Sequence, residues 1–306
     1  MARRRNRGRS VNGVLLLDKP TGITSNAALQ MVKRLFNANK AGHTGSLDPL
    51  ASGMLPVCLG EATKISGFLL SADKEYRATC KLGATTDSGD ADGEIRETRS
   101  VGELAVTQVE EVLEHFLGQS QQIPPMHSAI KRGGQPLYKL AHQGIEVERE
   151  PRDITIHSLK LLRFDSDELE LDVRCSKGTY IRVLAEDIGE ALSCGAHVAA
   201  LRRTGVGALD GHAMYTLEFL QAIVEQSGPH ALDELLLPME STLPDWPEVC
   251  LPEDASFYLC QGQAVFVPQL KDRGWVRLYA SDKRFLGLGT VLDDGRVAPK
   301  RLLSNN

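Results

Sequence analysis

Apolar residues recur along the chain with two different periods, and each period predicts one type of element. Continuous or alternating apolar positions predict strands at 12–18, 76–82, 154–161, 169–175, 179–183 and 198–203. Helical spacing with capping residues predicts helices at 24–36, 63–70 and 216–226, one that Thr107 and Glu110 begin and Gly118 ends, and one that follows 183 and ends near 195. This order of elements predicts a domain of mixed α and β structure.

Two stretches depart from this regular order. Between 119 and 152 the chain contains four prolines and the pair Gly133–Gly134, which predicts a long insertion with one short helix near 137–143. A proline-rich linker then leads to 251–303, where short apolar runs separated by turn residues indicate a small β-rich domain. The expected division is a basic arm at 1–10, a main domain at 11–248 and a second domain at 249–306.

Composition narrows the class of protein. The 306 residues are 42% hydrophobic, which is ordinary for a soluble protein. Their apolar runs are too short to span a bilayer, and no apolar stretch of a secretory signal follows the first arginines. The six cysteines include no C-x-x-C pair, so reduced thiols are expected and a zinc site is not. These features predict a cytoplasmic protein without a metal site.

The distribution of charge is more informative than its sum. The net charge is −5, but the first ten residues hold five arginines, so the remaining residues carry about −10. Such an arm can neutralise phosphates, or it can be a solubilising tail. An acidic chain still binds RNA where its basic residues line one surface, so the net charge excludes neither interpretation.

The segment 42–53 is the first candidate for chemistry. It reads Gly-His-Thr-Gly-Ser-Leu-Asp-Pro-Leu-Ala-Ser-Gly, and Pro49 restricts the backbone at Asp48 and therefore the direction of its carboxylate. Apolar neighbours indicate partial burial, and the nearest lysine or arginine in sequence is Lys40. A directed carboxylate of this kind suits nucleophilic or general-base catalysis. The same pattern also fits an Asp-Pro turn with a solvated carboxylate, and spacing alone does not decide between the two.

Two tyrosines are candidates for holding an unstacked base. A strand over 179–183 would place Tyr180 and Arg182 on one face, where an aromatic ring and a guanidinium can hold a base and a phosphate or carboxylate. Tyr76 opens another predicted strand and is also suited to stacking. An ordinary strand tyrosine gives each of these patterns more often than a base-binding one does, so each interpretation remains open at this point.

Other polar motifs carry less information. His43 is either a contact to phosphate or base, or a loop histidine with a backbone partner. The acidic segment 87–93 lacks the acid that a calcium loop needs at its twelfth position, where Arg99 stands, so a hairpin turn is the better interpretation. The chain has no phosphate-binding glycine motif and no Gly-x-Ser-x-Gly, which gives no support to nucleotide cofactors or serine hydrolysis.

Taken together, these segments resemble one family, the bacterial TruB type of tRNA pseudouridine synthases. The resemblance runs from about 11 to 301, and its most specific part is the Gly-His-Thr-Gly-x-Leu-Asp-Pro block, which guide-RNA-directed relatives share. The matching segments are 13–20, 41–53, 122–139, 175–182 and 201–203. The resemblance implies an α+β pseudouridine synthase fold, with a mainly antiparallel mixed sheet flanked by helices, an RNA-binding thumb insertion at about 119–152, and a PUA-like RNA-binding domain at the C-terminus.

The resemblance also implies a reaction. Such enzymes cleave the N-glycosidic bond of a uridine, rotate the base and rejoin it through C5, with neither metal nor organic cofactor. Asp48 would be the essential carboxylate, either as nucleophile or as base, and Arg182 would pair with it and keep its pKa low. Tyr76 would stack on the base and assist proton removal from C5. Tyr180, His43 and Leu201 would contact the flipped uridine, and Lys19 and Lys64 would serve structure or phosphate binding.

The implied substrate is uridine-55 in the T loop of tRNA, which must be flipped out at a cost of roughly a few kcal/mol. The expected partner is therefore the T stem-loop, without a membrane or an obligate protein partner, and a monomer is expected. Two other functions are weighed against this one. A non-catalytic tRNA-folding module would not need a directed carboxylate, and a glycosidase would need a second one, which the sequence does not offer clearly.

Overall fold

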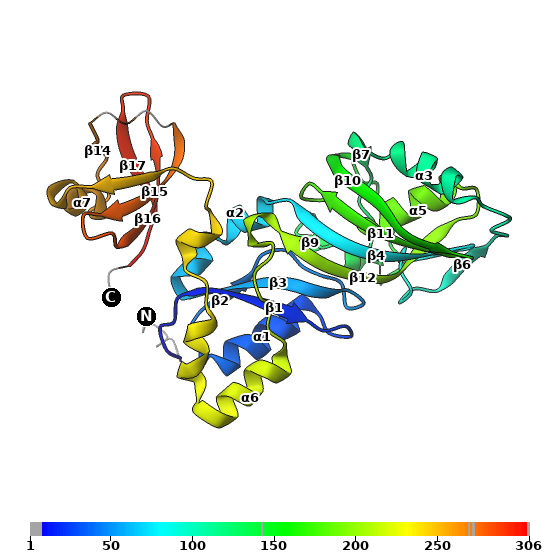
Figure 1. Ribbon diagram of the computed structural model, residues 1–306, viewed down its shortest axis with the longest axis horizontal. Coiled ribbons are helices and arrows are strands. Elements are labelled where there is room, and N and C mark those ends of the chain that lie inside the picture. The colour runs from blue at the N-terminus through cyan, green and yellow to red at the C-terminus, as the bar shows by residue number, and fades with distance from the viewer. Residues whose placement is uncertain (1–7, 142, 269, 271–272, 305–306) are drawn as a thin grey trace.

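The computed structural model describes residues 8–141, 143–268, 270 and 273–304. Figure 1 shows a large part built on one long sheet and a smaller β-rich part at the C-terminal end. Most of the basic arm, residues 1–7, lies outside the described residues. No helix in the described ranges is both long enough and apolar enough to cross a membrane.

One eight-stranded sheet forms the body of the large part. Its order is β1-β3-β12-β4-β11-β10-β7, with β2 beside β3, and every pair is antiparallel except β12 with β3. The strands are β1 (Gly13–Lys19), β2 (Ala41–His43), β3 (Ser52–Leu59), β4 (Lys74–Leu82), β7 (Gly118–Gln122), β10 (Arg152–Asp165), β11 (Glu168–Cys175) and β12 (Ala196–Val206). The mainly antiparallel mixed sheet expected from the sequence is therefore confirmed.

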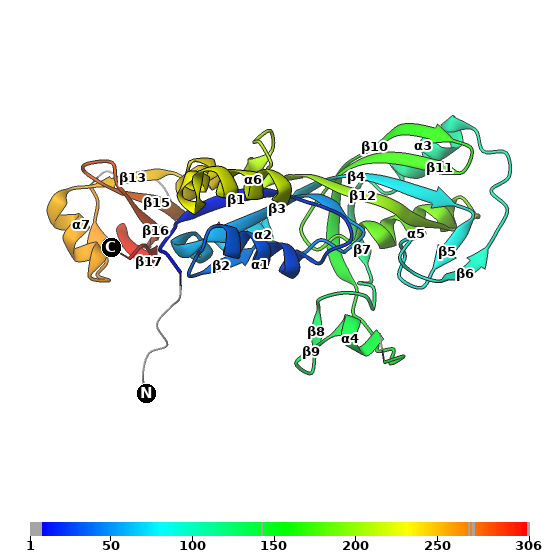
Figure 2. The ribbon, with the colours of Figure 1, turned by 90° about the horizontal axis from the view of Figure 1, so that it is seen from below.

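Helices cover both ends of this sheet (Figures 1 and 2). At the β1–β3 end lie α1 (Ser25–Leu35) and α6 (Leu217–Ser227), each begun by a threonine, Thr24 or Thr216, whose hydroxyl accepts a backbone N–H of the first turn. Against β10, β12 and β4 pack α3 (Val106–Glu114) and α5 (Ile181–Ala191). The apolar faces of these helices and of the sheet form one continuous core.

Shorter elements join these parts. They are the 3-10 helices η1 (Gly60–Lys64), η2 (Gly207–Leu209), η3 (Pro229–Leu235) and η4 (Met239–Thr242), the helix α2 (Ser66–Ser71), and the hairpin of β5 (Ala84–Thr86) and β6 (Ile95–Thr98). The hairpin turn expected at 87–93 is confirmed, because it joins β5 to β6. The helix expected at 63–70 is divided between η1 and α2.

Two sequence predictions are wrong. The strand expected at 179–183 does not form, because Tyr180 is the residue before α5 and Arg182 lies in the first turn of that helix. The β-branched and aromatic residues there favour a strand locally, and tertiary packing overrides this weak preference. The α3 helix is capped by Ala105 and not by Thr107, and the Gln108 Oε1 accepts the Ala105 backbone N–H at 2.8 Å. It also ends at Glu114, before Gly118, which begins β7.

The insertion leaves the sheet between β7 and β10. Its first residues, 118–122, belong to β7 and pair with β10, so the part that projects from the body is 123–151. This projecting part, called the thumb below, carries the hairpin of β8 (Lys131–Arg132) and β9 (Gln135–Pro136) and the helix α4 (Leu137–Ala141). Figure 2 shows it extending away from the sheet, and the short helix expected near 137–143 is confirmed.

The C-terminal part has its own core. Five strands pair in the order β13-β15-β16-β17-β14 around buried aliphatic residues, and one helix, α7 (Glu253–Cys260), was not expected from the sequence. The strands are β13 (Glu248–Leu251), β14 (Val265–Phe266), β15 (Gly274–Ala280), β16 (Phe285–Val291) and β17 (Arg296–Leu302). A second apolar cluster, which includes Leu288 of β16, joins this domain to the large part.

Candidate active site

The loop that carries Asp48 is held in place by three backbone anchors. The buried Ser25 hydroxyl donates to the Leu47 carbonyl at 3.0 Å and accepts the Leu47 N–H at 2.7 Å. The Gly22 N–H donates to the Pro49 carbonyl at 2.8 Å, and the Ala51 N–H to the Asp48 carbonyl at 3.1 Å. With Leu47 buried in the core, these bonds fix the backbone on both sides of Asp48.

Arg182 is the centre of the site. Its side chain is only 6% exposed, and its Nε lies 3.0 Å from Asp48 Oδ2 and 3.6 Å from Asp90 Oδ2. Its two terminal nitrogens donate to the Ser88 carbonyl at 2.8 Å and to the His127 carbonyl at 2.7 Å. One guanidinium therefore joins helix α5, the Asp48 loop, the acidic turn and the base of the thumb. The pairing of Asp48 with Arg182, expected only from the resemblance, is present.

Arg182 lowers the Asp48 pKa as expected, but the net shift is upward, so the expected low pKa is wrong. Burial raises the pKa of this carboxyl above its usual value, Arg182 lowers it, Asp90 raises it further, and burial prevails. The Asp48 side chain nevertheless keeps 43% of its exposure, so a substrate can reach it. The protein around the carboxylate thus removes part of its hydration, and Arg182 offsets only part of the resulting rise in pKa.

Asp90 is a site residue that the sequence did not indicate, because it lies in a turn rich in Asp and Gly. It is 4% exposed, and its Oδ1 accepts from the Ser88 hydroxyl at 2.6 Å and from the Asp92 N–H at 3.2 Å. Backbone bonds between this turn and Val198 of β12 hold it beside α5. Only this tertiary contact brings Asp90 to Arg182, 92 positions away in sequence.

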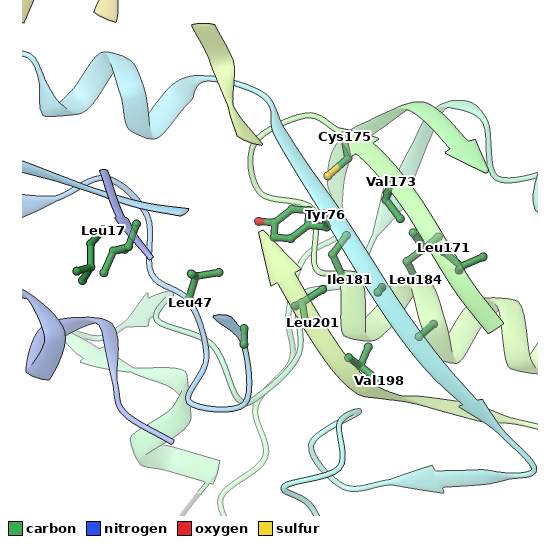
Figure 3. Packing of buried hydrophobic residues seen from close by; sticks show 14 of the residues in the cluster. Leu17, Leu47, Tyr76, Leu171, Val173, Cys175, Ile181, Leu184, Val198 and Leu201 are labelled. Atoms are coloured by element: carbon green, nitrogen blue, oxygen red, sulfur yellow. The ribbon is translucent and has the colours of Figure 1, made fainter. Parts of the chain in front are cut away.

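Tyr76 and Leu201 lie on neighbouring strands at the end of the core. Each is 9% exposed, and Figure 3 shows the Tyr76 hydroxyl directed away from Val173 and Leu171. Burial raises the pKa of this phenol, while the charge of the neighbouring Arg203 lowers it. The apolar side of the site is therefore a ring and an aliphatic side chain, and its polar edge is the phenol.

Tyr180 is fixed through its backbone. The buried Gln122 side chain accepts the Tyr180 N–H at 2.8 Å and donates to the Tyr180 carbonyl at 3.1 Å. Gln122 ends β7 where the thumb begins, so the same residue ties the thumb to the start of α5. Burial raises the pKa of the Tyr180 phenol as well.

The remaining candidates differ in their positions. His43 ends β2; burial lowers its pKa, and its buried Nδ1 has no hydrogen-bond partner among the described residues. Lys19 is fully buried, donates to the Pro20 and Ile23 carbonyls at 2.8 Å each, and has its pKa lowered by burial to about 8. Lys64 instead pairs with Glu61 and donates at 2.7 Å to a carbonyl of β17, so its partners join the two domains.

The arrangement can support chemistry with a single catalytic carboxylate. Asp48 is the exposed acid, whereas Asp90 is buried and bonded within its own turn. No group of three or more His, Cys, Asp or Glu side chains in the described ranges could hold a metal ion. The one carboxylate, its guanidinium and a stacking surface suit a reaction at a sugar whose base is held beside it.

The fold and the site fit a pseudouridine synthase, and the comparisons with known proteins show this class. Three family models match the chain: the TruB family pseudouridylate synthase N-terminal domain over 33–181, the tRNA pseudouridylate synthase B C-terminal domain over 182–244, and the pseudouridine synthase II TruB C-terminal domain over 247–303. The chain belongs to the TruB family.

Relatives match along nearly the whole chain. The tRNA pseudouridine synthase B of Nitrosococcus oceani is 57% identical over 300 residues, which are 98% of this chain and 97% of that protein. The protein of the same name from Yersinia pestis is 54% identical over 99% of this chain and 95% of its own length. Among solved structures, a Cbf5-Nop10-Gar1 complex matches with a TM-score of 0.72 and 28% identity, over 92% of this chain and 78% of that one.

Proposed function

We propose that this chain converts uridine-55 in the T loop of tRNA to pseudouridine, as a cytoplasmic monomer that needs neither metal nor cofactor. The observation that carries the proposal is the accessible Asp48 carboxylate, 3.0 Å from the buried Arg182 and on the same core as Tyr76. The names of the full-length relatives give tRNA as the substrate class. In this proposal residues 11–248 form the catalytic domain and 249–306 the PUA-like domain.

The proposed reaction separates the base from its sugar and then rejoins the two. Asp48 acts on the ribose, as nucleophile or as base, while the N1 glycosidic bond breaks, and the base turns so that C5 bonds to the anomeric carbon. The proton of C5 is then lost to water, and the Tyr76 phenol assists its removal. Arg182 favours the ionised form of Asp48, whereas burial opposes it. Arg182 therefore raises the fraction of enzyme molecules in which Asp48 is ionised and able to react.

Substrate binding in this proposal falls to the aromatic side chains and the thumb. Tyr76 stacks on the flipped base, Leu201 closes its apolar side, and Tyr180 and His43 contact the flipped nucleotide. The insertion 119–152 holds five cations against three acids, although the whole chain is acidic. Four of these cations are exposed and available for phosphates: Lys131, Arg132, Lys139 and Arg152.

The decisive experiment replaces Asp48 by Asn and maps pseudouridine at single-nucleotide resolution in an unmodified T-stem-loop RNA. We expect the wild type to modify one uridine and the variant to lose turnover by at least 10³-fold, as for removal of a covalent catalyst, with RNA affinity within threefold. Asp92→Asn is the matched control, since Asp92 is an exposed acid of the neighbouring turn. A variant with near wild-type turnover would remove Asp48 from the mechanism.

A further inference from the structure

Arg203, on strand β12 of the sheet, is a second buried arginine beside Arg182 of α5, and the reaction as proposed above does not use it. Its exposure is 1%, and on β12 it lies between Gly53 of β3 and Tyr76 of β4, which are its cross-strand partners. The approach to β3 is so close that a Cβ on Gly53 would lie 2.2 Å from the Arg203 carbonyl oxygen. The backbone of Arg203 therefore has one position relative to both neighbouring strands.

The partners of its guanidinium belong to the segment that carries Asp48. The Arg203 Nε donates to the Met54 carbonyl at 2.7 Å, and Nη2 donates to the Gly45 carbonyl at 3.1 Å. Among the described residues no carboxylate lies within 4.0 Å of this guanidinium, in contrast to Arg182 with two and Arg202 with one. A buried cation that is balanced only by carbonyl dipoles lowers the stability of the fold. Such a cation is expected where it serves a function.

Its other neighbour is the Tyr76 ring. Cross-strand partners on adjacent strands point to the same face of a sheet, so the Arg203 side chain lies beside the Tyr76 ring, and its charge lowers the pKa of the Tyr76 phenol. The other ionisable groups that face this phenol are Cys175 of β11, a neutral thiol whose pKa burial raises to about 11, and Asp48 itself. Of the charged groups around it, Arg203 has the largest effect on the pKa of the Tyr76 phenol, which it lowers.

We propose that Arg203 is a positioning residue, whose guanidinium bridges the Tyr76 hydroxyl and the carbonyls at both ends of the Asp48 loop and thereby fixes the distance between the base platform and the carboxylate. This role rests on the proposed isomerisation. While the base is detached from its sugar, no covalent bond sets their relative position, so the protein alone must present C5 to the anomeric carbon. A displacement of about 1 Å between reacting groups is enough to cost roughly 10²-fold in rate.

The test compares Arg203→Lys with Arg202→Lys. Lysine keeps the charge, but its single ammonium cannot span a phenol and two carbonyls. The neighbouring Arg202 is 41% exposed and pairs with Asp18, so it is the matched control. With unmodified T-stem-loop RNA, we expect Arg203→Lys to lower the single-turnover rate 10- to 100-fold at an RNA affinity within twofold, and Arg202→Lys to change neither. An Arg203→Lys rate within twofold of the wild type overturns the proposal.

A double-mutant cycle with Tyr76→Phe separates positioning from a general loss of structure. If Arg203 acts through the Tyr76 hydroxyl, the double variant loses less than the product of the two single losses, whereas losses that multiply contradict the proposal. A measurement without substrate keeps the inference testable if the Arg203 variants fold poorly. The Arg203 Nε–H resonance should shift in the well-packed Tyr76→Phe variant, and an unchanged resonance also overturns the inference. The resonance is measured without turnover. It therefore tests the contact between Arg203 and Tyr76 even if the wild type makes no pseudouridine, so failure of this inference can be told apart from failure of the proposed function.

Discussion

The clamp between Gln122 and Tyr180 gives a prediction that links stability to the site. Gln122 is 4% exposed, and its amide makes both hydrogen bonds to the Tyr180 backbone. Replacing it by Leu keeps the approximate volume but leaves the Tyr180 N–H without its partner, while the Tyr180 carbonyl keeps the Leu184 N–H, at 3.1 Å. An unpaired N–H costs about 1–3 kcal/mol, so we expect the free energy of unfolding to fall by roughly that amount.

The same change should act on the reaction. Tyr180 directly precedes α5, and Arg182 lies two residues further, so a looser start of the helix displaces both the ring and the guanidinium. We expect the single-turnover rate to fall about tenfold or more, with a smaller effect on RNA affinity.

Gln121→Leu is the control for both measurements. Gln121 is the neighbouring residue of β7 and is exposed. Its side-chain amide donates to the Asp153 carboxylate at 3.1 Å and makes no bond to the Tyr180 backbone. Urea denaturation and single-turnover assays on the two variants should separate them clearly. Equal stability of Gln122→Leu and Gln121→Leu would refute the reasoning, since it would mean that the Tyr180 backbone finds other partners without cost.

Two further predictions concern pH and backbone geometry. Burial raises the pKa of Glu186 to about 7, so the protonated form of this side chain stabilises the fold. This stabilisation is fully present below about pH 4.5, the usual pKa of the unfolded chain, and is lost as the pH rises through 7. In urea titrations we therefore expect Glu186→Gln to be more stable than the wild type at pH 8 and equally stable at pH 4. Gly53 and Gly22 both have positive φ, but of the two only Gly53 would bring a Cβ into collision with Arg203. We therefore expect Gly53→Ala to lower the melting temperature much more than Gly22→Ala. Similar losses for the two variants would contradict the close contact between β3 and β12.

Much of the architecture follows from local patterns in the sequence. The strands at 12–18, 76–82 and 169–175 were placed to within about two residues, because apolar alternation reports directly which face of a strand is buried. The helix at 24–36 was set by its threonine cap, a signal contained in a few neighbouring residues. The conformation of 179–183 was missed because its β-branched and aromatic side chains favour a strand, while packing of α5 against β12 and the Gln122 clamp stabilise a helix.

The site divides in the same way. The sequence by itself determined that Asp48 lies in a restricted, partly apolar loop, and the resemblance supplied Arg182 as its partner. Only the tertiary structure decided that Asp90 shares that guanidinium, that burial outweighs Arg182 and raises the Asp48 pKa, and that Arg203 lies beside Tyr76 and binds the same loop. The physical reason is that desolvation and charge pairing depend on distances between segments far apart in the chain, and no local pattern contains those distances.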